Sequence, residues 1–195
     1  AIGSATLPGH LVLVTNGVYC TGIVEGGYGP SRVALTNRVV VQSVNGPQVT
    51  VIEGSRSDPD TGEGIDVRCA YVGDGSVMSG FTLTNGVGGV YSEPLGVVTN
   101  CIITGNTGTG FGPDCASSAV GLFKINYSLI GIPAPCLLSG ETSGNNQTQA
   151  AADALGTFTG TYYPLKSGSL AIDNGTNTGC PSTDQIGQPR PVNGG

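Results

Sequence analysis

A short segment that recurs along the chain constrains the fold more than any other feature of the sequence. Ser79–Gly86 matches Thr99–Asn106, with Phe81 aligned on Cys101. A weaker third copy, Ile125–Gly131, places Asn126 opposite Asn100. Repeats with periods of about 20–50 residues are typical of solenoids, in which each repeat buries its apolar residues only by stacking on its neighbours.

Short apolar runs rich in β-branched residues occur along most of the chain, and each ends at Gly, Asn or Asp. These terminal residues supply the positive φ angles that tight corners require. No extended helical pattern is present, although one or two helical turns are predicted within 148–155. The sequence therefore predicts an all-β chain. The clearest expected strands are Leu11–Val14, Val39–Val44, Val49–Ile52 and Val67–Val72.

Three short strands per repeat, stacked in parallel at about 4.8 Å, would account for the recurring segment. In this arrangement the segments around Phe81, Cys101 and Tyr127 lie above one another in one interior column. Asn100 and Asn126 then occupy the same corner and form a hydrogen-bonded ladder. The alternative that the sequence leaves open is a Greek-key β-sandwich with chance similarity between strands.

The charge balance bears on the partners of the chain. Its formal net charge is −6, with seven Lys and Arg residues in total, and nucleic acid and anionic lipid both require clustered positive charge. We therefore expect no nucleic-acid partner. No apolar run approaches the length of about 18–20 residues needed for a membrane span. No signal-peptide pattern is present either, so we expect any such segment to have been removed already.

The six cysteines form no CxxC pair, and His10 is the one histidine, so a zinc site is not indicated. An even count at wide spacing favours disulfides formed in an oxidising compartment, although the sequence leaves the pairing open. Three Asn-x-Ser/Thr sequons provide candidate N-glycosylation sites. We therefore expect a secreted, extracellular or cell-surface protein. The disulfide candidates are Cys20, Cys69, Cys101, Cys115, Cys136 and Cys180, and the glycosylation candidates are Asn126, Asn146 and Asn174.

Five of the thirteen acidic residues lie between Glu53 and Asp66. Asp58, Asp60 and Glu63 are hard oxygen ligands in a glycine-rich turn, which makes them candidates for binding Ca²⁺, the one cofactor that the sequence suggests. Their spacing does not follow the EF-hand pattern. The interpretation we favour is a long solvated loop that projects between two repeats, with its charges partly paired with neighbouring arginines.

The sequence presents no catalytic constellation. Hydrolysis of a polysaccharide needs two carboxyl groups about 5–9.5 Å apart that flank the bond to be cleaved. No acidic residues recur with the period of the repeat. His10 has no acidic residue near it in the sequence, so no Ser-His-Asp constellation is indicated. Exposed tyrosines could stack on sugar rings, but packing at the corners is the more common role of such residues. Asp173 and Asp184 are expected to be turn formers.

Three segments resemble the coils of exported bacterial right-handed parallel β-helix proteins of the pectate-lyase-like superfamily: Leu13–Tyr19, Val41–Pro47 and Ser79–Gly86. Two more, Gly168–Gly175 and Thr183–Pro191, resemble the end of the helix in surface proteins of the choice-of-anchor Q type. The resemblance implies a right-handed parallel β-helix, or β-solenoid, with irregular loops and a loop-rich C-terminal tail. Residues 1–140 would form the stacked coils, and 141–195 a terminal coil and the tail of the same domain. Members of the family usually carry an N-terminal segment over the first coil, whereas this chain is expected to begin inside the helix.

Two classes of function remain. The favoured one is a structural or adhesive extracellular protein without catalysis, because a solenoid presents unpaired strand edges at its ends. Such ends can pair with copies of the same chain in a head-to-tail manner that does not close, giving rods or filaments. The alternatives are a polysaccharide lyase or glycoside hydrolase, in which the acidic loop would have to meet Arg68 or Lys124, and a passive glycan-binding module.

Overall fold

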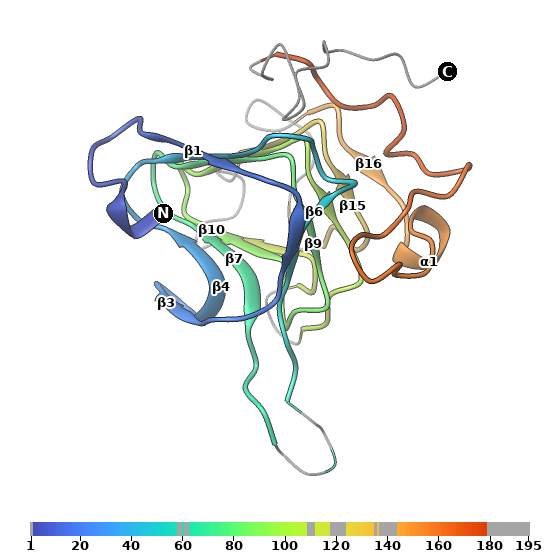
Figure 1. Cartoon of the computed structure of the whole chain (residues 1–195), viewed down its shortest axis with the longest axis horizontal. Coiled ribbons are helices and arrows are strands. Elements are labelled where there is room, and N and C mark those ends of the chain that lie inside the picture. The colour runs from blue at the N-terminus through green and yellow to red at the C-terminus, as the bar shows by residue number, and fades with distance from the viewer. Residues whose placement is uncertain are drawn as a thin grey trace.

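The computed structural model describes residues 2–57, 60, 63–108, 112–117, 124–134, 136 and 144–178. Within this part the chain is nearly all β, with a 3-10 turn at Ile2–Ser4 and one short helix, α1 (Ala151–Ala154). The strands form three sheets, named A, B and C below, around a common interior (Figure 1). The expectation of an all-β chain is confirmed.

The chain passes from sheet A to sheet B to sheet C and then returns to sheet A, so that neighbouring strands of a sheet are one circuit apart in the sequence. Every pairing between these strands is parallel except that of β3 with β4. In spatial order, sheet A contains β1 (Leu11–Val14), β5 (Val40–Ser43), β8 (Val77–Ser79), β11 (Val97–Thr99) and β14 (Lys124–Asn126). Sheet B contains β2 (Gly17–Tyr19), β6 (Thr50–Glu53), β9 (Thr82–Thr84), β12 (Ile102–Ile103), β15 (Leu129–Ile130) and β16 (Gln147–Thr148). Sheet C contains β3 (Val24–Gly26), β4 (Gly29–Leu35), β7 (Arg68–Val72), β10 (Val90–Ser92) and β13 (Cys115–Ser117).

The register of the strands shows which residues of successive repeats lie opposite one another. Thr82 pairs with Ile102, which confirms the predicted alignment of the first two copies. Asn126 pairs with Thr99 and not with Asn100, so the predicted alignment of the third copy is wrong by a single position. Tyr127, not Asn126, therefore follows at the corner that Asn100 occupies in the preceding circuit. The Asn100–Asn126 ladder does not form.

The corner between sheets A and B explains this register. Gly80, Asn100 and Tyr127 each follow the sheet A strand of their circuit and have φ angles of 83°, 53° and 48°. The corner requires left-handed backbone, which Gly and Asn adopt readily and Tyr adopts at a cost. Alignment by residue identity therefore places Asn126 at this corner, whereas the backbone places Tyr127 there.

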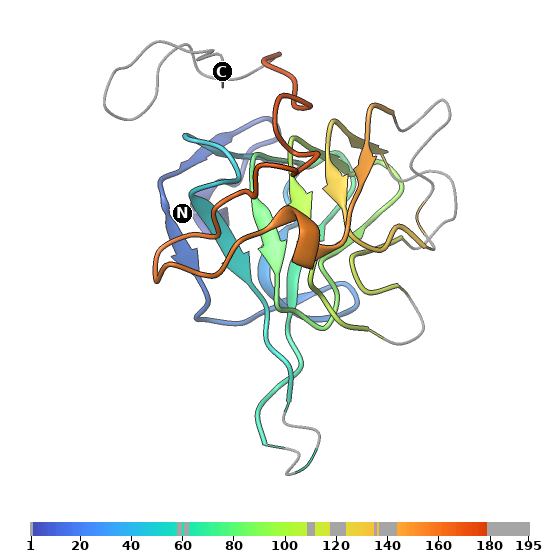
Figure 2. The ribbon, with the colours of Figure 1, turned by 90° about the vertical axis from the view of Figure 1, so that its right-hand side faces the viewer.

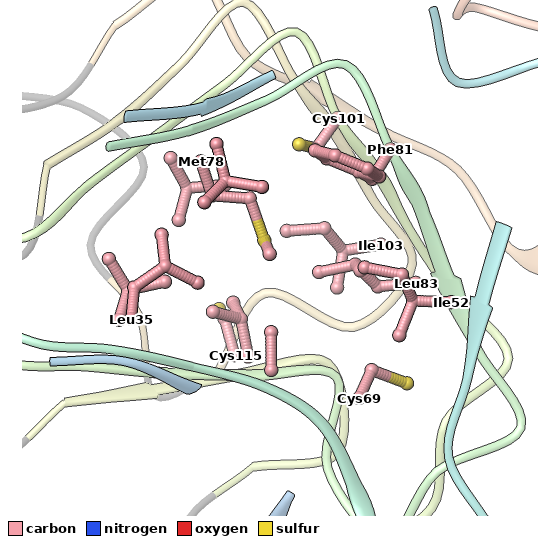
Figure 3. Packing of buried hydrophobic residues seen from close by; sticks show 14 of the residues in the cluster. Leu35, Ile52, Cys69, Met78, Phe81, Leu83, Cys101, Ile103 and Cys115 are labelled. Carbon is pink, nitrogen blue, oxygen red and sulfur yellow. The ribbon is translucent and has the colours of Figure 1, made fainter. Parts of the chain in front are cut away.

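Aliphatic side chains from all three sheets fill the interior (Figure 3). Met78 of sheet A, Leu83 and Ile103 of sheet B and Leu35 of sheet C all point into it and are fully buried. Phe81 and Cys101 lie side by side in the interior, as predicted. Tyr127 does not join this column, because its side chain is 37% exposed on the outside of the corner.

The outer faces of sheets B and C are covered. Ile102 and Leu129 on the outer face of sheet B pack against Ala154 and Leu155 of the C-terminal segment, which crosses in front of this sheet in Figure 2. Buried residues on the outer face of sheet C form a separate cluster, namely Ala34, Tyr71, Tyr91 and Ala116. The ring of Tyr28, from the turn of the β3–β4 hairpin, stacks on that of Tyr91 at 4.3 Å.

The cysteines behave differently from the expectation that they form disulfides. Cys115 and Cys136 form a disulfide, whereas Cys69 and Cys101 are buried free thiols and Cys20 is an exposed one. The buried thiols occupy interior positions that a small apolar residue would fill. The sixth candidate, Cys180, lies outside the described residues.

Candidate binding groove

A groove of about 750 Å³ runs along the corner between sheets A and B. One bank is the corner itself, from the turn after β5 to Tyr127. The other bank is the C-terminal segment between Leu165 and Asn177. The groove crosses successive circuits and follows the stacking direction, because its lining includes residues beside β5, β8, β11 and β14.

Asn100 fixes the two banks relative to one another. Its Nδ2 donates to the carbonyl oxygen of Thr176 at 3.1 Å, and its Oδ1 accepts from the backbone N–H of Thr176 at 2.8 Å. This pair of bonds satisfies both polar backbone groups of Thr176, as a neighbouring strand would. A corner residue with left-handed backbone thereby holds the C-terminal segment over sheet B.

Side-chain amides also shape the C-terminal bank. Gln149 accepts from the N–H of Leu170 at 2.8 Å and donates to the carbonyl of Gly168 at 3.0 Å. Asn174 donates to the carbonyls of Leu170 and Ile172 at 3.0 and 3.1 Å. These bonds give the segment a defined path without regular secondary structure.

The described lining mixes polar and apolar side chains in similar amounts and contains neither Lys, Arg nor His. Side-chain amides are the most frequent polar groups in it, and Asp173 is the one carboxylate among the lining residues that the structure describes. The side chains of Gln48, Asp173 and Asn177 have no hydrogen-bond partner among the described residues. The groove therefore offers uncharged hydrogen-bond donors and acceptors, and the Asp173 carboxylate adds one negative charge.

The glycosylation candidates lie around this groove. Asn174 lines it, and Asn126 and Asn146 each precede a lining residue, Tyr127 and Gln147. The Asn146 amide is engaged in the fold, since its Oδ1 accepts from the N–H of Ser128 at 3.0 Å and its Nδ2 donates to the carbonyl of Ile125 at 2.8 Å.

The acidic segment is not part of the groove. It leaves the body between β6 and β7 as a projecting arm with an antiparallel bridge between Ser55 and Val67 at its base (Figures 1 and 2). Within the arm the Asp66 carboxylate accepts from the N–H and hydroxyl of Ser57, both at 2.8 Å, and these bonds lower the pKa of Asp66. This geometry agrees with the favoured interpretation of a projecting loop.

Two of the three Ca²⁺ candidates fall within the described residues. No group of three or more acidic, His or Cys side chains there could hold a metal ion. Asp60 and Glu63 lie in the arm, and Asp58 falls outside the described residues.

Arg68 and Lys124, the basic residues that the enzyme hypothesis requires, do not line the groove. Arg68 lies 5.1 Å from the ring of Tyr91 on sheet C and donates to the carbonyl of Tyr28. Lys124 lies in sheet A at β14. His10 is exposed just before β1.

Two polar clusters in the structure were not predicted from the sequence. On sheet B, the Tyr163 hydroxyl donates to Glu53 at 2.9 Å, and Asn85 donates to both the Glu53 carboxylate and the Tyr163 oxygen. Burial and the Glu53 carboxylate raise the pKa of Tyr163. This cluster attaches the C-terminal segment to the sheet, and no sequence signal marks it because its members are far apart in the chain.

The second cluster is inside the fold. Asp114 is buried beside Asn106, whose own amide oxygen accepts from the Cys69 thiol at 3.3 Å and from the N–H of Gly86 at 3.0 Å. Burial raises the pKa of Asp114 and raises that of Cys69 to about 12. The side chains of this cluster form hydrogen bonds with buried backbone groups of the irregular connections between strands.

The N-terminal end of the stack is a second distinctive surface. β1 and β2 are the end strands of sheets A and B, so one edge of each has no partner strand in the described part of the chain. Between them lies an apolar hollow of about 330 Å³, lined by residues such as Ile2, Val12 and Val14. Leu11 and Leu13 of β1 are more than half exposed. Sheet C differs, because β3 covers the edge of β4.

Comparisons with known proteins gave no match among family models, curated proteins or solved structures. Within the described residues, no helix is long and apolar enough to cross a membrane.

Proposed function

We propose that this chain is a right-handed parallel β-helix of the pectate-lyase-like superfamily, with an end similar to that of choice-of-anchor Q surface proteins. Its passage through three parallel sheets in a constant order supports this proposal. The hand follows from the general rule that crossovers between parallel strands of one sheet are right-handed.

The function that this geometry supports best is that of an extracellular structural or adhesive protein that associates end to end without catalysis. The observation that carries it is the N-terminal end, where the edges of β1 and β2, unpaired within the described residues, flank an apolar hollow. Unpaired edges with exposed apolar side chains are templates for another chain. The hydrophobic surface around Leu11 and Leu13 would be buried in such a contact.

The partner surface is the opposite end of a second copy. β16 ends sheet B, and parallel stacking of β2 on β16 would continue the existing strand spacing of about 4.8 Å. In sheet A, Gly144 already pairs with Asn126 of β14 through a parallel bridge, so the second copy would meet the segment that contains Gly144. This contact joins two different surfaces, so it propagates into rods instead of closing as a dimer. The Cys115–Cys136 disulfide is in keeping with an oxidising compartment outside the cell.

Sedimentation velocity across a range of protein and salt concentrations tests the proposal. We expect species larger than the monomer that grow with concentration and persist at high salt, because backbone pairing and apolar burial are weakly screened. Leu13→Lys should shift the protein to monomer, since a charged residue on an edge strand opposes pairing.

Leu95→Lys is the matched control. Leu95 is 60% exposed, against 51% for Leu13, but lies in the turn between β10 and β11, away from the end. This variant should associate like the parent chain. A parent chain that stays monomeric under all conditions, or equal behaviour of the two variants, would contradict end-to-end association.

A further inference from the structure

We propose that the groove between the sheet A–B corner and the C-terminal segment binds a neutral oligosaccharide. This inference names a class of ligand for the proposed adhesive role, and it rests on the proposed function only for the link to adhesion. The groove lies on the flank of the stack, so its occupancy can be measured independently of association at the ends.

The lining matches the hydrogen-bonding pattern of sugar hydroxyls, each of which both donates and accepts. A side-chain amide offers the same pair of functions, with two N–H donors and one carbonyl acceptor. Gln48 on the corner bank and Asn177 on the C-terminal bank both have amides with no partner among the described residues. An oligosaccharide that extends along the groove would offer hydrogen-bond partners to both.

Apolar contacts are available on both banks as well. Tyr127 on the corner bank is 37% exposed, and Leu170 on the opposite bank is 42% exposed. The C–H faces of a sugar ring pack on an aromatic ring while the equatorial hydroxyls remain free for hydrogen bonds. Tyrosine suits this role, because it combines a large apolar face with a polar tip.

The charge of the groove selects among sugars. Its described lining contains no cationic side chain, and Asp173 carries a carboxylate without a partner in the same part of the chain. A uronic acid would therefore meet a like charge and no compensating one. The ligand class is a neutral sugar and not an acidic polysaccharide.

The dimensions favour a chain over a single sugar. The volume of about 750 Å³ falls within the range of about 300–1,000 Å³ usual for small-molecule sites. Along the corner the groove passes the ends of β5, β8, β11 and β14, which are three strand spacings, or about 14 Å, apart. Polar side chains beside β5, β11 and β14 line this length together with apolar ones, so consecutive sugars would find both kinds of contact.

The groove is suited to binding and not to cleavage. Hydrolysis requires a second carboxylate about 5–9.5 Å from the first, whereas Asp173 is the one carboxylate among the described lining residues. Saturable binding without release of shorter products is therefore expected.

The test uses titration calorimetry and NMR with the whole chain, produced without N-glycans, and soluble cello-, xylo-, manno- and malto-oligosaccharides. We expect saturable binding of at least one of these ligands, and weaker binding of an oligogalacturonate of the same length. Absence of saturable binding to all four neutral series, or tighter binding of the oligogalacturonate, would overturn the inference.

Tyr127→Asn is the decisive variant. Asparagine adopts left-handed backbone readily, and Asn100 already occupies the equivalent corner one circuit earlier, so the ring is removed without strain. Affinity should fall about fivefold to tenfold, the usual worth of one aromatic contact. Tyr162→Ala is the control, because Tyr162 is 36% exposed but lies outside the groove.

Asp173→Asn separates the roles of charge and shape. This variant should bind the neutral ligand within about twofold of the parent and narrow the difference between neutral and acidic sugars, because the repulsive charge is gone. Unchanged affinity in Tyr127→Asn would place the ligand elsewhere and overturn the assignment. Leu13→Lys, which lies outside the groove, should bind the neutral ligand like the parent, so failure of the groove and failure of end-to-end association are distinguishable.

Discussion

The Asn106 amide donates to the Asp114 carboxylate at 2.9 Å inside the fold, where both side chains are almost completely buried. The same carboxylate accepts from the backbone N–H of Asn106 and, through Oδ2, from the N–H of Ile132. Asp114 thus joins the connections that follow β12 and β15, the sheet B strands of successive circuits. A buried carboxylate in this role makes the stability of the fold depend on pH.

The first prediction concerns that dependence. Burial raises the pKa of Asp114 above its ordinary value, despite the hydrogen bonds that lower it. The folded state therefore binds the proton more tightly than the unfolded state, and the contribution of Asp114 to stability falls as pH rises between the two pKa values. Urea unfolding at a series of pH values should show this decline.

Asp114→Asn isolates the effect. The free energy of unfolding of this variant should be about 1–3 kcal/mol lower than that of the parent at neutral pH, because an amide cannot replace both acceptor oxygens. It should also flatten the acidic part of the stability curve. Asp153→Asn, on the exposed surface of α1, should reproduce the parent curve. Equal pH profiles for Asp114→Asn and the parent would contradict a raised pKa.

The second prediction concerns thiol reactivity. Burial raises the pKa of Cys69 to about 12 and that of Cys101 to about 11, and the thiolate is the reactive form. Iodoacetamide at mildly alkaline pH should therefore modify exposed Cys20 in the folded protein and leave Cys69 and Cys101 unmodified. Peptide mass spectrometry after native and denatured labelling measures this difference.

In denaturant without reductant, Cys69 and Cys101 should become reactive, whereas Cys115 and Cys136 should require reduction first. Detection of Cys69 or Cys101 in a disulfide would contradict the structure.

The repeat could be predicted from the sequence where consecutive circuits have the same length. Thr82 and Ile102 occupy the same place in the first two copies and pair directly, so apolar and turn residues recur in phase. The next circuit, which leads from Ile102 to its partner Leu129, is longer, and there a shared Asn suggested a register that the backbone does not adopt. Residue identity is a weaker guide than the φ angle that the corner requires.

The groove could not be predicted in the same way. Its two banks are joined through Asn100 and Thr176, 76 residues apart, and the Glu53–Tyr163 bond spans 110 residues. A periodic pattern reports contacts between neighbouring circuits, but the C-terminal segment follows no period. The cysteine count likewise could not separate disulfides from buried thiols, because cysteine also behaves as a small apolar residue.

The third prediction concerns the joint between the banks. Asn100→Ala removes both hydrogen bonds to Thr176 and places alanine at a φ angle of 53°. The expected loss of stability is about 2–5 kcal/mol, from two bonds at about 0.5–1.5 kcal/mol each and left-handed strain of about 1–2 kcal/mol.

Asn100→Gly separates the two causes, because glycine removes the bonds without the strain. It should be more stable than Asn100→Ala by about 1 kcal/mol, while both variants expose the C-terminal segment to limited proteolysis. Stability equal to that of the parent in both variants would show that Asn100 does not hold the segment.

The fourth prediction concerns close packing at the corner that precedes β10. A Cβ atom on Gly89 would lie 2.4 Å from the carbonyl oxygen of Asp114 and 2.5 Å from a methyl group of Ile103. Since neither a backbone oxygen nor a packed core side chain can withdraw cheaply, Gly89→Ala should destabilise the fold by about 1–3 kcal/mol. Gly168→Ala is the control, because a Cβ there meets nothing within 4 Å. Thermal unfolding of the two variants should therefore separate them by several degrees, and equal midpoints would contradict the packing of Gly89 against the Asp114 backbone.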